Sequence, residues 1–310
     1  MTAKIKLLQI GQFPEDAQNL IKAQFNCILP AQLDQNPQLR TDIRGIVTRS
    51  NYRIPEDTVR SLPNLGIIAT CGVGYDGIPV KLAHARDVVV TNTPDVLNSA
   101  VAELTVGLIL ALLRRLPAAH HYVHANRWPE GPFPLGESLA GKHVGIVGYG
   151  RIGKSIAERL SVFGAHLAYH GRRRQPVDMA YQPDLTALAR DSDILVLAAP
   201  GGQATTHMIN AQVLSALGAA GYLVNIARGS LVNETDLVNA LSSGAIAGAA
   251  LDVHAAEPHV NQELLKLDNV ILTPHMGSAT HQTRMAMAEL TLSNLRRFFE
   301  GKPVLTPVSS

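Results

Sequence analysis

The chain has 310 residues, of which 46% are hydrophobic and 17% are charged, so it can bury large cores and we expect two domains. A formal net charge of +2 gives no broad positive field, which argues against nucleic acid as a partner and favours small anions held by local basic clusters. Two cysteines and a first segment without a signal-peptide type of apolar stretch predict a reduced, cytoplasmic protein. The longest apolar run, Leu104–Leu113, is too short to cross a bilayer and predicts a buried helix.

Ten short runs rich in Val, Ile and Leu follow one another along the chain, and each is typical of a buried parallel strand. Helical stretches separate most of them, which predicts an α/β fold. The predicted strands are Ile5–Ile10, Gly45–Thr48, Gly66–Thr70, Val88–Thr91, Val144–Val147, Leu167–Tyr169, Ile194–Ala198, Leu223–Ile226, Ala247–Leu251 and Val270–Leu272.

Helical periodicity predicts Ile152–Phe163, and Asp236–Leu241 after a capping Asn233. Two longer helical segments, from about Asn98 to Leu116 and over Thr280–Phe299, are candidates for crossings between domains. The proline- and glycine-rich stretch from Trp128 to Pro134 predicts a loop or arm.

A glycine-rich turn in the middle of the chain indicates a dinucleotide site. The strand ending at Val147 is followed by Gly148-Tyr149-Gly150-Arg151-Ile152-Gly153 and then by a helix, and this strand–turn–helix context makes the pattern specific. Gly148 permits the tight turn, Gly150 lets the backbone approach a pyrophosphate, and Gly153 lets helix and strand pack closely. The phosphates are expected at the positive N-terminus of the helix. A glycine-rich turn of an ordinary α/β protein is the alternative.

The residues after the next strand bear on the choice of cofactor. His170 stands where an acid usually binds the ribose 2′-hydroxyl. Gly171-Arg172-Arg173-Arg174 follows it, and guanidinium groups are suited to a 2′-phosphate. NADP(H) is therefore the expected cofactor, with a solvated basic turn as the alternative.

Three segments beyond the fingerprint carry a resemblance to a known family. They are Val224–Ser230, Leu251–Pro258 and Thr273–Thr280, and their order and content resemble the D-isomer-specific 2-hydroxyacid dehydrogenases. The upstream segments Gly72–Asp76, Thr91–Leu97 and Val101–Leu104 resemble the N-terminal half of the same family. The resemblance covers essentially the whole chain and is greatest to glyoxylate/hydroxypyruvate reductases and hydroxyphenylpyruvate reductases.

This resemblance implies two Rossmann-like domains. A flavodoxin-like substrate domain is expected from residues 1–98 and 284–310, and an inserted, doubly wound NADP-binding domain from residues 99–283. The implied activity is reduction of small 2-oxo acids, such as glyoxylate, hydroxypyruvate or larger ones, to D-2-hydroxy acids. The resemblance also implies a homodimer built largely from the cofactor domain, and whether Trp128 reaches the partner's active site is left open.

The family's catalytic triad is matched here by Arg228, Glu257 and His275. The resemblance assigns the proton donor to His275, because an imidazolium suits general acid catalysis near neutral pH. Glu257 is expected to orient and stabilise that imidazolium. Arg228 is expected to bind the substrate carboxylate and to polarise the carbonyl group.

The remaining expected site residues bind the cofactor or the substrate. Asp252 is expected to hold the nicotinamide carboxamide, with Gly277 and Ser278 beside it, and the turn at Gly72-Val73-Gly74 to complete the anion site through its N–H groups. The cofactor set is Thr105, Gly148, Gly150, Arg151, Ile152, Gly153, Arg172, Arg173, Pro200, Thr205, Ile226, Ala227, Asp252, Gly277 and Ser278, and the substrate set is Ser50, Gly72, Val73, Gly74, Arg228 and His275.

Two departures from the family pattern stand out. The family usually reads Pro-Leu-Thr-Pro where this chain reads Pro200-Gly201-Gly202-Gln203, so we do not expect the family's contacts near the adenine to be the same here. His254 stands where an aromatic residue, usually phenylalanine, is common, and we expect it to change packing rather than chemistry.

Other functions fit the sequence less well. His120, His121 and His124 include a helical i, i+4 pair, but no Cys, Asp or Glu joins them locally, so no metal site is expected. Ser230 lies outside any GxSxG elbow, which argues against a serine hydrolase. A non-enzymatic, dinucleotide-sensing corepressor and a formate or phosphite dehydrogenase remain as alternatives, and turnover with 2-oxo acids separates them.

Overall fold

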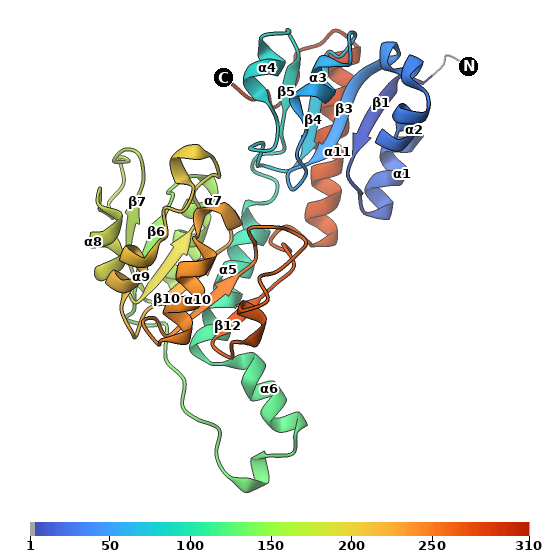
Figure 1. The fold of residues 1–310 in the computed structure, drawn as a ribbon. Helices are drawn as coiled ribbons and strands as arrows, with labels where there is room; N and C mark the ends of the chain where they lie inside the picture. Colours follow the sequence, from blue (N-terminus) through green and yellow to red (C-terminus); the bar gives the residue numbers. More distant parts are fainter. Residues whose placement is uncertain (1–3, 310) are drawn as a thin grey trace. The chain divides into compact units, whose positions relative to one another are not determined.

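The computed structural model describes residues 4–309, which form two compact α/β units. The first unit contains the described residues up to Leu97 and from Ala279 onward, and the second unit is Asn98–Ser278. In each unit helices cover a central sheet on both faces (Figure 1). The α/β fold expected from the sequence is therefore confirmed, while the domain limits 98/99 and 283/284 stay a prediction.

The first unit has a five-stranded parallel sheet in the order β2-β1-β3-β4-β5, the strand order of flavodoxin-like folds. Alternate residues of a strand point to opposite faces, so Leu8 and Leu7 belong to two separate apolar clusters, one on each face. The strands are β1 (Lys6–Ile10), β2 (Asn26–Ile28), β3 (Ile43–Arg49), β4 (Ile67–Cys71) and β5 (Val89–Thr91), and the helices are α1 (Glu15–Gln24), α2 (Pro30–Gln35), α3 (Glu56–Arg60), α4 (Val80–His84) and α11 (His281–Phe299).

The second unit has a seven-stranded parallel sheet in the order β12-β11-β10-β9-β6-β7-β8. This order reverses between β6 and β9, where dinucleotide-binding folds bind their ligand. Its strands are β6 (His143–Val147), β7 (His166–His170), β8 (Ala180–Tyr181), β9 (Ile194–Leu197), β10 (Tyr222–Asn225), β11 (Gly248–Leu251) and β12 (Val270–Leu272), and its helices are α5 (Asn98–Leu113), α6 (Leu116–His124), α7 (Arg151–Val162), α8 (Leu185–Arg190), α9 (Ala211–Leu217) and α10 (Glu234–Ser242).

Local sequence accounts for where several helices begin. Asp184, Asn210, Asn233 and Thr280 each accept a hydrogen bond from a backbone N–H of the helix that follows. Such N-caps satisfy amide groups that have no partner within the helix. They fix the start of α8, α9, α10 and α11.

Three details differ from the sequence-based expectations. The predicted helix from Asn98 to about Leu116 ends at Leu113, because Arg115 adopts a left-handed backbone with φ of 50° and a new helix, α6, begins there. Strands β2 and β8 were not predicted, and each is an edge strand of only three or two residues. The loop predicted from Trp128 to Pro134 contains one 3₁₀ turn, Trp128–Glu130.

Residues 116–138 form an arm of the second unit. Figure 1 shows α6 extending away from the sheet of this unit and the following segment running back to it. No residue of α6 is buried, and Trp128 and Leu135 on the arm are 68% and 97% exposed. The return of the arm is tied to the sheet by Glu137, which accepts hydrogen bonds from Tyr222 (2.8 Å) and Lys142 (2.5 Å).

Within residues 4–309, no helix has the length and apolar character that crossing a membrane requires.

Candidate active site

The predicted dinucleotide turn lies between β6 and α7. Gly148 has a φ of +100°, and a Cβ there would lie 2.5 Å from the Ala199 nitrogen. A Cβ at Gly153 would overlap the Gly148 carbonyl oxygen, whereas a Cβ at Gly150, the N-cap of α7, would meet nothing within 4 Å among residues 4–309. The turn therefore leaves open space beside the N-terminus of a 12-residue helix, which is a favourable place for a phosphate.

The basic turn after β7 is exposed. His170 is half-buried, and its Nδ1 lies 3.0 Å from the Gln182 carbonyl oxygen. Arg172 and Arg173 are exposed, and among the described residues no carboxylate forms an ion pair with either. Both guanidinium groups are therefore available to an anionic ligand.

The other expected cofactor residues of this unit differ in burial and bonding. Thr105 of α5 is fully buried, and its hydroxyl donates to the Val101 carbonyl within the same helix (2.7 Å). After β9, the Thr205 hydroxyl donates to the Pro200 carbonyl (2.8 Å). The segments after β6, β7, β9, β10, β11 and β12 all follow the carboxyl ends of parallel strands, so they meet at one edge of the sheet. The expected residues at this edge are Gly148, Gly150, Arg151, Ile152, Gly153, Arg172, Arg173, Pro200, Thr205, Ile226, Ala227, Asp252, Gly277 and Ser278.

Glu257 and His275 form an ion pair. The Glu257 Oε2 lies 2.7 Å from the His275 Nδ1, and the two side chains are 21% and 28% exposed. Burial raises the pKa of Glu257, but the hydrogen bonds and charge of His275, together with the backbone N–H of His254, outweigh it, so the pKa of Glu257 is lowered. Glu257 is therefore a carboxylate at neutral pH, and the ring nitrogen of His275 left for proton transfer is Nε2.

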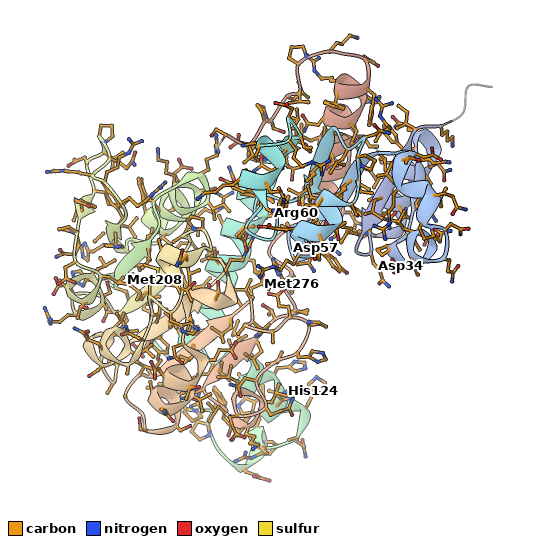
Figure 2. All side chains as sticks on the ribbon, turned by 45° about the horizontal axis from the view of Figure 1, so that its top comes forward. Asp34, Asp57, Arg60, His124, Met208 and Met276 are labelled. Carbon is orange, nitrogen blue, oxygen red and sulfur yellow. The ribbon has the colours of Figure 1, made fainter. Side chains whose placement is uncertain are left out.

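Asp252 holds the loop that carries His275. Its carboxylate, 1% exposed, accepts hydrogen bonds from the Thr273 hydroxyl (2.6 Å) and from the backbone N–H groups of Met276 and Gly277 (both 2.8 Å). Met276, labelled in Figure 2, directly follows His275. Three accepted bonds leave acceptor capacity on this carboxylate for a further donor.

Arg228 lies in a turn that a buried asparagine organises. Asn225, at the end of β10 and 1% exposed, accepts from the Ala227 N–H (3.0 Å) and donates to the Arg228 carbonyl (2.9 Å). The half-buried Arg228 side chain donates from Nη1 to the Ala227 carbonyl (2.8 Å). Asn225 and Thr273 were not predicted as site residues, although Asn225 is the next-to-last residue of the predicted strand Leu223–Ile226 and Thr273 directly follows the predicted strand Val270–Leu272.

The remaining expected substrate residues belong to the first unit. A Cβ at Gly72 would lie 2.5 Å from the Ser50 Oγ, so glycine permits the close approach of β4's end to Ser50. The Gly72 carbonyl accepts from the Thr93 N–H (2.9 Å), and the Val73 carbonyl accepts from Asn92 (2.9 Å). Gly72-Val73-Gly74 is therefore a well-anchored turn at the carboxyl edge of this sheet.

The histidines of α6 do not form a recognisable metal site. The rings of His120 and His124 have centroids 4.3 Å apart, and Figure 2 shows His124 on the arm. Among residues 4–309, no group of three or more His, Cys, Asp or Glu side chains is arranged to hold a metal ion.

Comparison with known proteins places these features in a family context. Residues 106–277 match the model of the D-isomer specific 2-hydroxyacid dehydrogenase, NAD-binding domain. The chain is 46% identical to glyoxylate/hydroxypyruvate reductase A of Arabidopsis thaliana over 271 residues, which cover 87% of this chain and 86% of that protein. It is 44% identical to hydroxyphenylpyruvate reductase of Plectranthus scutellarioides over 280 residues, 90% of each chain.

A solved structure resembles the chain over nearly its full length. It is an NADPH-dependent glyoxylate/hydroxypyruvate reductase from Sinorhizobium meliloti in complex with NADP and malonate. The two are 42% identical, with a TM-score of 0.93, and the match covers 99% of this chain and 97% of the other.

Proposed function

This chain belongs to the D-isomer specific 2-hydroxyacid dehydrogenase family, and on that premise we propose that it reduces small 2-oxo acids to D-2-hydroxy acids with NADPH. Glyoxylate and hydroxypyruvate are the proposed substrates, because the relatives named for them align over most of their length. The observation that carries the proposal is the Glu257–His275 pair, at 2.7 Å.

The pair fits the proton donor that reduction of a carbonyl group requires. The Glu257 carboxylate accepts a hydrogen bond from the His275 Nδ1 and favours the charged ring. The Nε2–H of that imidazolium then donates its proton to the carbonyl oxygen as the alcohol forms. Because Asp252 bonds to the residues on both sides of His275, the ring is held in place before substrate arrives.

Arg228 is the proposed cation for the substrate. A guanidinium group can bind a carboxylate through two parallel hydrogen bonds and polarise the neighbouring carbonyl. Asn225 bonds to the Ala227 N–H and to the Arg228 carbonyl, so the backbone that carries the guanidinium group has a defined conformation. The turn at Gly72-Val73-Gly74 and Ser50 are proposed to contact the substrate as well.

The residues present fit a dinucleotide with a 2′-phosphate. The open space at Gly150 and the N-terminus of α7 suit the pyrophosphate, and Arg172 with Arg173 suits the 2′-phosphate. When bound, NADPH supplies the hydride for the substrate's carbonyl carbon. The other residues of the expected cofactor set are proposed to line the same edge of the sheet.

We also propose that the chain is a cytoplasmic homodimer. The arm carries four exposed apolar side chains, Leu116, Val123, Trp128 and Leu135, which contact with a second copy of the chain would remove from water. Both cysteines are free thiols, which suits a reducing compartment. Light scattering on the purified chain tests the dimer, and a monomer at micromolar concentration would contradict it.

The function is tested by following oxidation of NADPH with a panel of 2-oxo acids. We expect sustained turnover with glyoxylate and hydroxypyruvate, and weaker turnover with phenylpyruvate. Binding of NADPH without turnover would instead favour the non-enzymatic dinucleotide sensor. Reduction of NADP⁺ by formate or phosphite, without activity on 2-oxo acids, would favour the formate or phosphite dehydrogenases.

A further inference from the structure

His254 lies where the three segments that carry the proposed catalytic residues meet. Its backbone N–H donates to the Glu257 Oε1 (3.2 Å), and its Nε2 lies 3.0 Å from the carbonyl oxygen of Thr273, two residues before His275. A Cβ at Gly229, next to Arg228, would overlap the His254 carbonyl group. His254 therefore contacts Glu257 itself and residues within two positions of Arg228 and His275.

The hydrogen bond of the His254 ring indicates which of its two nitrogens carries a proton. A carbonyl oxygen only accepts hydrogen bonds, so the His254 Nε2 carries a proton and donates a hydrogen bond to the Thr273 carbonyl oxygen. In the neutral ring the Nδ1 is then an acceptor, and among the described residues it has no hydrogen-bond partner although the side chain is only 7% exposed. A buried acceptor without a partner destabilises the folded chain, and an apolar side chain of similar size would avoid this.

The charged groups around His254 belong to the catalytic segments and to α10. Glu257 accepts from the backbone N–H of His254, and Glu234, the first residue of α10, accepts from the N–H of Ala255 (2.8 Å). Asp252 lies two residues before His254 and bonds to the Thr273 hydroxyl. The His254 side chain thus connects two segments through its hydrogen bond to Thr273: the segment that carries Glu257 and the loop that carries His275.

We propose that His254 is a positioning residue, which sets the separation of Glu257 and His275 through its hydrogen bond to the Thr273 carbonyl. The proposal rests on the proposed roles of Glu257 and His275. It also accounts for a buried imidazole at a position where an apolar side chain would be more stable, because the ring's donor holds the His275 loop in register with the carboxylate.

Three substitutions test the role of this donor. His254→Leu removes both the donor and the unpaired acceptor, His254→Asn has an amide that is too short to reach Thr273, and His254→Gln places an amide N–H at the reach of the Nε2. For Leu and Asn we expect kcat to fall about tenfold with KM for NADPH unchanged, because only the geometry of proton transfer is altered.

His254→Gln should restore at least half of kcat, because its amide N–H replaces the lost donor to Thr273. The midpoint of thermal unfolding of the Leu variant should equal or exceed that of the wild type. Wild-type kcat in the Leu and Asn variants overturns the proposal. Equal losses in all three variants with lower unfolding midpoints overturn it as well, since they indicate packing alone. If the Leu variant does not fold, Asn and Gln, which differ by one methylene, carry the test.

A parallel His275→Ala variant separates this inference from the proposed function. If His275→Ala loses turnover but the His254 variants behave like the wild type, only the positioning role fails. If His275→Ala turns over normally, the assignment of the triad fails first.

Discussion

His275 is held in an unusual backbone conformation by its neighbours. Its φ is +51°, a left-handed value that few residues other than glycine adopt. Asp252 bonds to Thr273, Met276 and Gly277 on both sides of it, and such conformations persist only where the surroundings enforce them. The backbone that carries the His275 ring is therefore held by the buried carboxylate of Asp252.

The first prediction concerns Glu257→Gln. Because the pKa of Glu257 is lowered, the group is charged at neutral pH, and its loss removes the partner that stabilises the His275 imidazolium. We expect kcat for glyoxylate to fall about tenfold or more, measured at neutral pH with saturating NADPH.

The same substitution tests the linkage to stability. A lowered pKa in the folded chain stabilises it above the pKa of the unfolded chain, and this stability is lost as the pH falls through the folded pKa. At neutral pH the wild type should therefore have a higher midpoint of thermal unfolding than Glu257→Gln, and the two midpoints should converge in acid. An unchanged kcat together with parallel stability curves would count against the ion pair.

The second prediction concerns Arg172→Ala. A charge-assisted hydrogen bond to a 2′-phosphate contributes about 1.5–3 kcal/mol, so losing one should reduce the preference for NADPH over NADH about tenfold or more. The measurement is kcat/KM for both cofactors. Arg174→Ala, in the same exposed turn, is the matched control and should change the preference less. A wild type that prefers NADH, or equal losses with both cofactors, would indicate a solvated basic turn.

At the scale of elements, two glycines of the turn between β6 and α7 are needed for different reasons. Gly153 is needed because α7 packs against the Gly148 carbonyl, whereas a Cβ at Gly150 would meet no atom of the described residues within 4 Å. The fingerprint identified this turn from sequence, because the glycines sit between an apolar strand and a periodic helix.

The third prediction compares Gly153→Ala with Gly150→Ala. The Cβ at residue 153 overlaps backbone, so we expect a loss of about 1–3 kcal/mol in the free energy of unfolding without cofactor. Gly150→Ala should leave that free energy within about 0.5 kcal/mol of wild type but weaken NADPH binding, because the added Cβ occupies space meant for the pyrophosphate. Equal effects of the two changes on unfolding, or unweakened NADPH binding in Gly150→Ala, would contradict this account.

Long apolar strands were predictable and short edge elements were not. All ten predicted strands are present, within two residues at each end, because buried parallel strands require continuous apolar runs. β8 has only Ala180 and Tyr181, which is too short to form such a run. The helix break at Arg115 depends on a single left-handed residue, which hydrophobic periodicity does not report.

At the scale of the whole molecule, the sequence predicted the fold of both units and the family, whereas the groups that support the site needed the structure. Asn225 and His254 hydrogen-bond to backbone carbonyl groups, and the Thr273 hydroxyl donates to the Asp252 carboxylate. The bonds of His254 and Thr273 join segments that are separate in the chain. No local pattern encodes such bonds. The sequence analysis assigned His254 to packing, and its buried bond to Thr273 motivates the positioning role proposed above.

The most direct test of the central claim is the NADPH-dependent reduction of glyoxylate by wild type and His275→Ala, with NADPH affinity measured by its fluorescence. We predict sustained turnover by the wild type and a loss of at least about a hundredfold in kcat for the variant, with unchanged NADPH affinity, since general acid catalysis supplies that much. Turnover of the variant at the wild-type rate, or a wild type that binds NADPH without oxidising it, would contradict the assignment of His275 as the proton donor of a 2-oxo acid reductase.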